Sequence, residues 1–179
     1  MGISFTGNIR IIERDEFGNL HERHAQNTMT SGGLALIASY LGAWSNRWLN
    51  ASVDRRHPLQ SAISPRPPHY LVYGSGTVPV GRFMTSVPGE TYRTANLDSI
   101  TDGASVTFHG YLGDTENASQ TIGCYGLVGG VANAQPGNAG SDPNYNEILV
   151  AVANEPTPFG KGTASTVSID WVITVSGVI

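Results

Sequence analysis

The stretch Thr163–Ile179, with the sequence TASTVSIDWVITVSGVI, decides the fold. Its odd positions from 167 to 175 are all apolar, whereas four of the five even positions from 168 to 176 are polar. Successive side chains of a strand point to opposite faces, so this alternation predicts a strand with one apolar face. Burying an apolar side chain of this size stabilises by about 1.5–3 kcal/mol before the entropy cost. We therefore expect a strand inside a sheet, with Val167, Ile169, Trp171, Ile173 and Val175 facing the core.

The composition fits one domain over residues 1–179 that is built from many short strands. Only 13% of the residues are charged, against about a quarter in typical domains, while Gly numbers 22 and Pro 10. Glycine and proline are typical of the turns between strands. The low charge has two interpretations that both stay open: a surface shared with neighbouring subunits, or a neutral loop surface rich in Ser, Thr and Asn.

Net charge, cysteine count and hydropathy argue against several classes of protein. The formal charge of −4 is not that of a nucleic-acid binder, which would carry a basic patch. Cys124 is the one cysteine, so it predicts neither an intrachain disulfide nor a zinc site, and its apolar neighbours indicate a buried thiol. No apolar run approaches the roughly 20 residues that span a bilayer. We expect neither nucleic acid nor membrane as a partner.

The N-terminal part predicts a hairpin followed by one short helix. Residues 3–13 alternate, residues 15–19 form a polar turn with a glycine, and the polar return arm 20–26 belongs at a sheet edge. On that arm His21 and His24 point to opposite faces, which favours surface histidines over a metal pair. Residues 27–31 supply candidate helix N-caps, and the apolar residues that follow at helical spacing are Leu34, Ile37, Ala38 and Leu41.

Two long loops and a pair of tryptophans are the candidate interaction elements. Residues 50–68 lose periodicity and contain four prolines, and residues 132–145 form a second excursion rich in glycine and proline. Trp44 and Trp48 fit a core edge or a subunit contact better than a sugar-stacking platform, and all three interpretations stay open. Because aromatic and arginine side chains are enriched in interface cores, we predict a contact surface made of Trp44, Arg47, Trp48, Arg55, Arg56 and Arg66.

The rest of the chain predicts further strands. We expect strands at residues 69–73, 90–97, 104–112, 120–131 and 148–153, a loop at 78–89 and a turn at 98–103. Gly110 predicts a bulge or a bend, and the glycines of 120–131 predict close backbone approach to the helix or to a neighbouring subunit. Glu155–Pro158 is expected to end its strand. The fold class is mainly β, an antiparallel β-sandwich of jelly-roll kind with seven or eight strands and one short helix.

No catalytic constellation stands out in the sequence. The five histidines are scattered, and no nucleophile elbow, zinc-protease motif or Cys/His cluster is present. Asp114 and Glu116 lie two residues apart near a turn, where acidic residues are usually solvated rather than a glycosidase pair. We expect a protein that is not an enzyme and that holds no cofactor or metal.

The order of several short stretches resembles small structural proteins of tailed-bacteriophage virions. The first stretch joins the turn at Asp15–Asn19 to NTMTSGGL at Asn27–Leu34, which is similar to the N-x-v-T-x-x-G-l-x-x-i-a start of those proteins. The second is YGSGT at Tyr73–Thr77 followed by ETYR at Glu90–Arg93, similar to their G-x-G-T and E-x-x-R segments. The third comprises Tyr125–Gly130, Glu147–Ala151 and Ser168–Val175.

The resemblance implies a self-assembling or docking β-domain in the virion. Its expected partners are copies of itself and other proteins of the tail, baseplate or neck, reached through loops and strand edges. Two alternatives stay open. One is a capsid decoration (cement) protein, which differs only in its place in the particle, and the other is a carbohydrate-binding module that recognises host-surface polysaccharide. The loops at 50–68 and 132–145 depart from the simplest pattern of those proteins.

Overall fold

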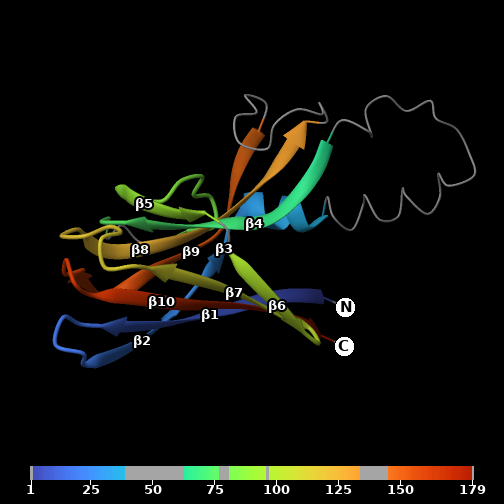
Figure 1. Cartoon of the computed structure of the whole chain (residues 1–179). Helices are drawn as coiled ribbons and strands as arrows, with labels where there is room; N and C mark the ends of the chain where they lie inside the picture. The colour runs from blue at the N-terminus through green and yellow to red at the C-terminus, as the bar shows by residue number, and fades with distance from the viewer. Residues whose placement is uncertain (1, 39–62, 77–80, 96, 134–144, 179) are drawn as a thin grey trace, which may run out of the picture.

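The computed structural model describes residues 2–38, 63–76, 81–95, 97–133 and 145–178 (Figure 1). Within these residues ten strands form two five-stranded antiparallel sheets, and residues 31–38 are helical. Sheet A has the order β2-β1-β10-β7-β6, with the strands Leu20–Gln26, Gly2–Arg14, Thr166–Val178, Ser105–Leu112 and Asp98–Asp102. Sheet B has the order β3-β9-β8-β4-β5, with the strands Thr28–Met29, Tyr145–Gly160, Thr121–Asn133, Ile63–Gly74 and Glu90–Ala95. The mainly β prediction is confirmed.

The predicted C-terminal strand is β10, and it lies at the centre of sheet A between β1 and β7. Val167, Ile169, Trp171 and Ile173 are buried as predicted. The prediction is wrong for Val175, whose exposed fraction is 43%. The pairing of β10 with β7 ends at Thr174, so Val175 lacks a neighbouring strand on that side.

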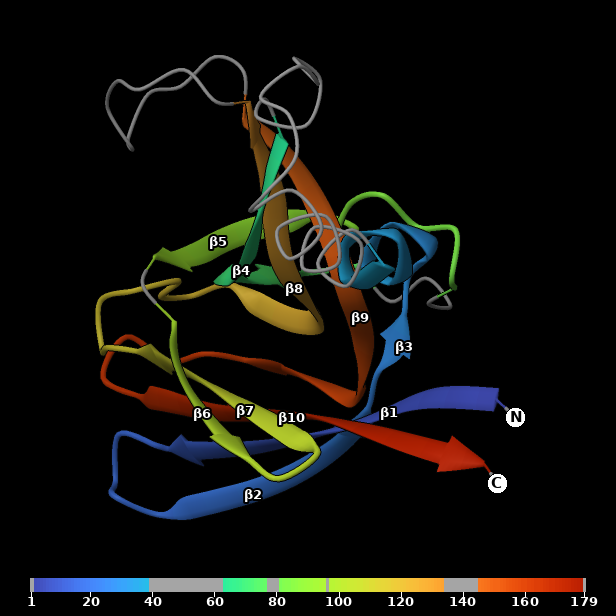
Figure 2. The ribbon, with the colours of Figure 1, turned by 90° about the vertical axis from the view of Figure 1, so that its right-hand side faces the viewer.

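One core fills the space between the two sheets. Side chains of β1, β7 and β10 meet side chains of β4, β8 and β9 in a single cluster, which gives the chain its sandwich-like arrangement (Figures 1 and 2). The fully buried members with the largest side chains include Trp171, Tyr73, Tyr125, Ile9, Ile11, Leu71, Leu112, Ile122, Leu127 and Ile169.

The outer face of sheet B is covered by the segment 81–89 and bordered by the helix. Val87 of this segment is buried in a second cluster with Val72, Cys124, Val128, Leu149 and Val152, and Met84 packs against that cluster. The helix begins beside β9, where the backbone N–H of Thr30 donates to the carbonyl of Val150 at 3.0 Å. Sheet B is therefore buried on both faces, which explains why β8 and β9 have apolar or glycine residues at successive positions.

The predicted helix cap and the buried thiol are confirmed. The Thr30 hydroxyl accepts a hydrogen bond from the backbone N–H of Gly33 at 2.9 Å, which satisfies a donor in the first turn of the helix. Cys124 is fully buried, and burial raises the pKa of its thiol. The predicted hairpin is also present, because β1 and β2 pair around the turn at residues 15–19 and β2 is an edge strand.

Two proline-containing segments form strands. The first was predicted as part of a loop and the second as the end of a strand, so both predictions were wrong. Residues 63–68, predicted as part of a loop, belong to β4, which pairs there with β8 alone. A strand with one unpaired edge tolerates proline, and the pairing shifts register between Arg66 and Tyr70, around Pro67 and Pro68. Likewise β9 continues to Gly160, and its residues 155–158 form a bulge opposite Gly123 of β8.

The structure corrects two further predictions in sheet A. Residues 98–102, predicted as a turn, form the edge strand β6, and all five are exposed, so they carry no alternation by which to recognise a strand. Gly110 makes no bulge, because β7 keeps continuous register with β10 across it. A Cβ at Gly110 would lie 2.5 Å from Cδ2 of Leu71, so this glycine makes room for a side chain of the opposite sheet.

The predicted long loops coincide only in part with the described residues. β8 extends to Asn133 and β9 begins at Tyr145, so the expected loop 132–145 shortens at both ends. Residues 39–62 and 134–144 lie outside the described residues. In the ranges that are described, none of the helical structure has the length and apolarity needed to cross a membrane.

The glycines of β8 yield a test of the packing on sheet B. A Cβ at Gly126 would lie 2.2 Å from Cγ2 of Val87, so Gly126→Ala must lift the covering segment off the sheet. We expect a loss of about 1–3 kcal/mol in the free energy of unfolding, measured by urea denaturation. Gly160→Ala on β9 is the matched control, because no heavy atom lies within 4 Å of the added Cβ, and it should change stability by less than about 0.5 kcal/mol. Equal effects of the two substitutions would contradict the close approach.

Candidate functional site

The contact residues predicted from the sequence do not yield a site in the described structure. Trp44, Arg47, Trp48, Arg55 and Arg56 lie outside the described residues. Arg66 lies in β4, where its backbone pairs with Gly130 of β8, and its side chain is outside what the structure describes. The predicted interface therefore stays a prediction.

The outward side of sheet A is the broad surface that the fold leaves uncovered. In Figures 1 and 2 no described segment lies beyond this sheet, in contrast to sheet B with its covering segment and neighbouring helix. Its outward positions follow from the registers, because residues opposite the even positions of β10 share their face. We call this surface the open face, and its members with charged, histidine or large apolar side chains are Arg10, Ile12, Arg14, Leu20, Glu22, His24, Asp98, Ile100, Asp102, His109, Tyr111, Asp170 and Val172.

A row of ionisable side chains crosses all five strands of the open face. In order from β2 to β6 the row is His24, Arg10, Asp170, His109 and Asp98, and each member is the direct register partner of the next. Directly opposed side chains on one face of a sheet lie about 4.5–5.5 Å apart at Cβ, so each member is within reach of its neighbours.

Short polar contacts form two groups in this row, one that joins Arg10 and His24 through Glu22 and one between His109 and Asp170. Arg10 donates from Nε to Glu22 Oε1 at 2.8 Å, His24 Nε2 lies 3.2 Å from the same oxygen, and His109 Nδ1 lies 2.7 Å from Asp170 Oδ1. The hydrogen bond between Arg10 and Glu22 raises the pKa of the guanidinium and lowers that of the carboxyl. The side chains in these pairs are 36–69% exposed, so water screens them and they contribute little to folding. These charges stay accessible to a partner.

The two halves of the open face differ in charge. The half on β1 and β2 carries two arginines and one glutamate, namely Arg10, Arg14 and Glu22. The half on β10, β7 and β6 carries three aspartates, Asp98, Asp102 and Asp170, with neither Arg nor Lys. Exposed apolar side chains lie among them, since Leu20, Ile100 and Tyr111 have exposed fractions of 69%, 62% and 57%. The open face is thus a polar, partly apolar surface with a cationic and an anionic half.

His109 and Asp170 form a hydrogen-bonded pair on the surface. Each has more than a third of its side chain exposed, and both stand on a sheet face open to water. Among the described residues no three His, Cys, Asp or Glu side chains gather as a metal site would need. Catalytic groups work best in a concave, water-excluding site, whereas these two side chains lie on a sheet face open to water.

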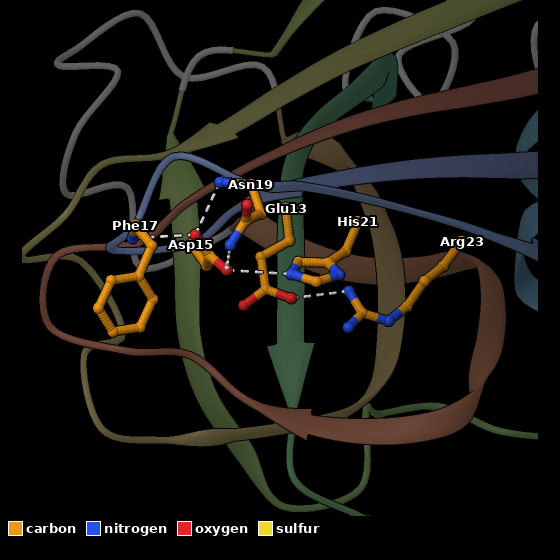
Figure 3. A network of polar contacts seen from close by, with 6 residues as sticks. All are labelled: Glu13, Asp15, Phe17, Asn19, His21 and Arg23. Carbon is orange, nitrogen blue, oxygen red and sulfur yellow. Dashed lines mark hydrogen bonds and ion pairs between the residues drawn. The ribbon is translucent and has the colours of Figure 1, made fainter.

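The turn between β1 and β2 presents an aromatic side chain next to the open face. Figure 3 shows Asp15 at its centre: the carboxylate accepts from the backbone N–H of Phe17 at 2.9 Å, from that of Asn19 at 2.8 Å and from Asn19 Nδ2 at 2.9 Å, and His21 Nε2 lies 3.2 Å away. These hydrogen bonds, led by that from the Asn19 side chain, lower the pKa of Asp15 to about 2. Gly18 adopts φ +86°, which suits glycine in a tight turn. Phe17 is 82% exposed at the tip of this fixed turn.

The inward side of the same hairpin carries a partly buried ion pair, also drawn in Figure 3. Arg23 donates from Nη1 to Glu13 Oε2 at 2.8 Å, and the guanidinium carbon lies 4.0 Å from the centre of the Phe159 ring. Glu13 is almost fully buried, so removing Arg23 would leave its charge without compensation. This pair secures the hairpin against β9.

Further buried polar groups lie at the same end of the two-sheet body. Tyr125 donates to Glu155 Oε2 at 2.7 Å, and Lys161 donates from Nζ to the carbonyl of Asp114 at 2.9 Å, while burial lowers the pKa of Lys161. Glu116, expected to be solvated, instead accepts from the Tyr92 hydroxyl at 2.7 Å and from the backbone N–H of Gly113 at 2.8 Å. Both hydrogen bonds lower its pKa, with that from Gly113 the larger cause. These contacts fix loop 113–120 and indicate a structural role.

Comparisons of the chain with models of protein families, with curated proteins and with solved structures find no match.

Sequence reasoning missed the row on the open face, although part of the signal was present. Predicting a turn at residues 15–19 already places Arg10 opposite His24, because the positions of paired residues in that hairpin add to a constant. The partners Asp170, His109 and Asp98 come from strands far apart in the sequence, and no local pattern fixes their register.

The Asp15 turn predicts a pH dependence. Because the pKa of Asp15 is lower in the folded chain than its ordinary value of about 3.8, its ionised form stabilises the fold above that value, and this stabilisation is lost as the pH falls toward 2. We expect Asp15→Asn to lower the thermal midpoint at pH 6, with a difference from the wild type that shrinks between about pH 5 and about pH 2. Circular dichroism melts measure this, and Glu16→Gln, at an exposed position of the same turn, is the control. A difference that does not change with pH would contradict the role of the charge.

Two neighbouring buried tyrosines allow a test of how much the hydrogen bond to Glu155 contributes to stability. The rings of Tyr73 and Tyr125 lie 6.0 Å apart, but only the Tyr125 hydroxyl has a hydrogen-bond partner among the described side chains. Tyr125→Phe leaves the buried Glu155 carboxylate without its donor and should cost about 1.5–3 kcal/mol of unfolding free energy. Tyr73→Phe removes a hydroxyl without a partner and should change it by less than about 0.5 kcal/mol. Denaturant titration decides, and a larger loss at Tyr73 would refute this assignment.

Proposed function

We propose that this chain is a non-enzymatic structural protein of a tailed-bacteriophage virion, which docks in multiple copies as a tail, baseplate or neck component. The observation that carries the proposal is the asymmetry of the two sheets: sheet B is covered, whereas no segment among the described residues covers the outward face of the five-stranded sheet A. The open face combines charged and apolar side chains of which several are more than half exposed. The order of short stretches that resembles virion proteins supports a place in the virion, without choosing between tail and head.

The edges of sheet A support docking through its face more than through its edge strands. The outer strand β2 carries His21, Glu22, Arg23 and His24 in succession, and the outer strand β6 is short and bears Asp98 and Asp102. Charged and short edge strands oppose pairing with a further strand. We therefore assign the contacts to the open face and to the turn that presents Phe17. In sheet B the consecutive strands β8 and β9 are neighbours and form a hairpin. The jelly-roll arrangement of the sandwich is part of the proposal.

A carbohydrate-binding role is the second candidate, and Tyr111 is the observation that favours it. Its ring is 57% exposed on the flat open face, in the strand that also carries His109. An exposed aromatic ring beside hydrogen-bonding side chains is able to stack on a sugar. Capsid decoration shares the docking surface of the first proposal and differs only in the part of the particle that the protein occupies.

Immunogold electron microscopy with antibodies raised against the purified chain tests the proposal. Particles released from the host of this gene should carry label at one defined structure, and deletion of the gene should remove that structure or abolish infectious particles. Label on the tail, baseplate or neck supports the first assignment, and label over the head supports decoration. Complete, infectious particles that contain none of this chain by mass spectrometry would refute a structural role.

The carbohydrate alternative has its own measurement. Purified wild-type chain and Tyr111→Ala are titrated with surface polysaccharide from the host bacterium. Saturable binding that Tyr111→Ala weakens at least about tenfold, the scale of losing one stacked aromatic contact, would favour the carbohydrate role. Absence of binding by the wild type would remove it.

A further inference from the structure

We propose that the open face of sheet A pairs with the open face of a second copy, about a two-fold axis that runs parallel to the strands. This inference rests on the proposed docking in multiple copies and names both the surface and the occupant. The argument begins with the charge pattern, because the cationic half on β1 and β2 and the anionic half on β10, β7 and β6 lie side by side on one face.

Symmetry determines which halves meet. A two-fold axis in the plane of the interface and parallel to β10 reverses the strand order of the second copy. The strands β1 and β2 of one copy then lie over β7 and β6 of the other, and β10 lies over β10. The cationic half faces the anionic half twice, once on each side of the axis. A two-fold axis perpendicular to the strands would instead place each half over its own equivalent, so charge complementarity selects the first arrangement.

The row of ionisable residues fits this arrangement. Under the parallel axis, His24 faces the second copy's Asp98, and Arg10 faces its His109, which lies between Asp98 and Asp170 of that copy. The two Asp170 carboxylates approach the axis, but each has His109 at 2.7 Å and Arg10 as its register partner on the other side. The arginine of the second copy also lies about one strand spacing, ~5 Å, from the axis. Each central carboxylate therefore has an arginine of its own copy and one of the second copy about one strand spacing away across the sheet.

The size of the face is adequate for a specific contact. With about 4.8 Å between strands and about 3.4 Å per residue, the paired positions of the five strands level with Thr166 to Thr174 project to about 600 Å², because β2 and β6 cover only part of that length. Stable interfaces bury about 800 Å² on each partner. Ile100, exposed on β6, adds apolar area opposite the second copy's Gln26, whereas Leu20 is level with Thr166 and lies beyond the end of the facing β6. Because most of the charges are exposed, the dimer should weaken as salt rises.

A charge-swap experiment tests the pairing directly. The variant Arg10→Glu/Arg14→Glu makes both halves anionic, and the variant Asp98→Lys/Asp102→Lys makes both halves cationic. Each variant alone should self-associate at least about tenfold more weakly than the wild type in sedimentation experiments at about 50 mM salt. An equimolar mixture of the two should restore a heterodimer, because opposite charges then meet on both sides of the axis.

The controls separate this inference from loss of folding and from the proposed function. Arg82→Glu makes the same kind of charge change on the exposed segment that covers sheet B, and it should leave association unchanged. Circular dichroism verifies folding, and if a charge-reversed variant is unfolded, Arg10→Gln and Asp98→Asn replace it with a smaller expected loss.

Three outcomes overturn the pairing. The first is a wild type that stays monomeric up to about 100 μM, a concentration that covers weak interfaces. The other two are variants that associate like the wild type and a mixture that stays monomeric. None of these bears on immunogold labelling of particles, so the failure of face pairing and the failure of the virion role are distinguishable.

Discussion

The period of two along β10 is the constraint on which both surfaces of sheet A depend. Trp171 and Ile169 point into the core, so Asp170 and Ser168 must point out of it. A slip of one residue would bury Asp170 and expose the indole of Trp171, and both changes are unfavourable. Because β10 pairs with β1 over its whole length and with β7 over eight positions, this choice also assigns every residue of those strands to the core or to the open face. The core and the candidate docking surface are thus set by one strand.

Sheet B satisfies a different constraint, because both of its faces are buried. Its central strands cannot alternate between apolar and polar residues, and β8 instead intersperses small and large apolar side chains. Gly126 lies where Val87 of the covering segment descends onto the sheet, and Gly123 lies where the backbone of Ser75 and Gly76 passes. The sequence analysis expected close approach at these glycines and assigned it to the helix or a neighbouring subunit; the structure assigns it to segments of the same chain.

Local sequence patterns predicted many of the strands and turns. The register between distant strands, and the strands at sheet edges, depend on contacts that no local pattern shows. The hairpin of β1 and β2, the strand β10 and the Thr30 cap each depend on residues close in sequence, and each is confirmed. The prolines near residues 65–68 and 156–158 were misread, because proline is excluded from a paired interior and not from a strand with one free edge or a bulge. The edge strand β6 has no buried side, so its sequence looks like a turn. Of the candidate site, only Arg10 opposite His24 followed from the turn at 15–19, since the remaining neighbours depend on registers between distant strands.

The acidic residues of β6 affect both the edge of sheet A and its open face. As exposed charges on a short outer strand, Asp98 and Asp102 oppose the addition of another strand, so sheet A does not extend sideways into an uncontrolled polymer. As members of the open face, the same two carboxylates make its outer half anionic, opposite in sign to the half that carries Arg10 and Arg14. A surface that disfavours growth at its edges and is complementary to itself across its face selects closed, discrete contacts over open ones. That selection suits the proposed docking in multiple copies, and it arises from side chains that contribute little to the stability of the single chain.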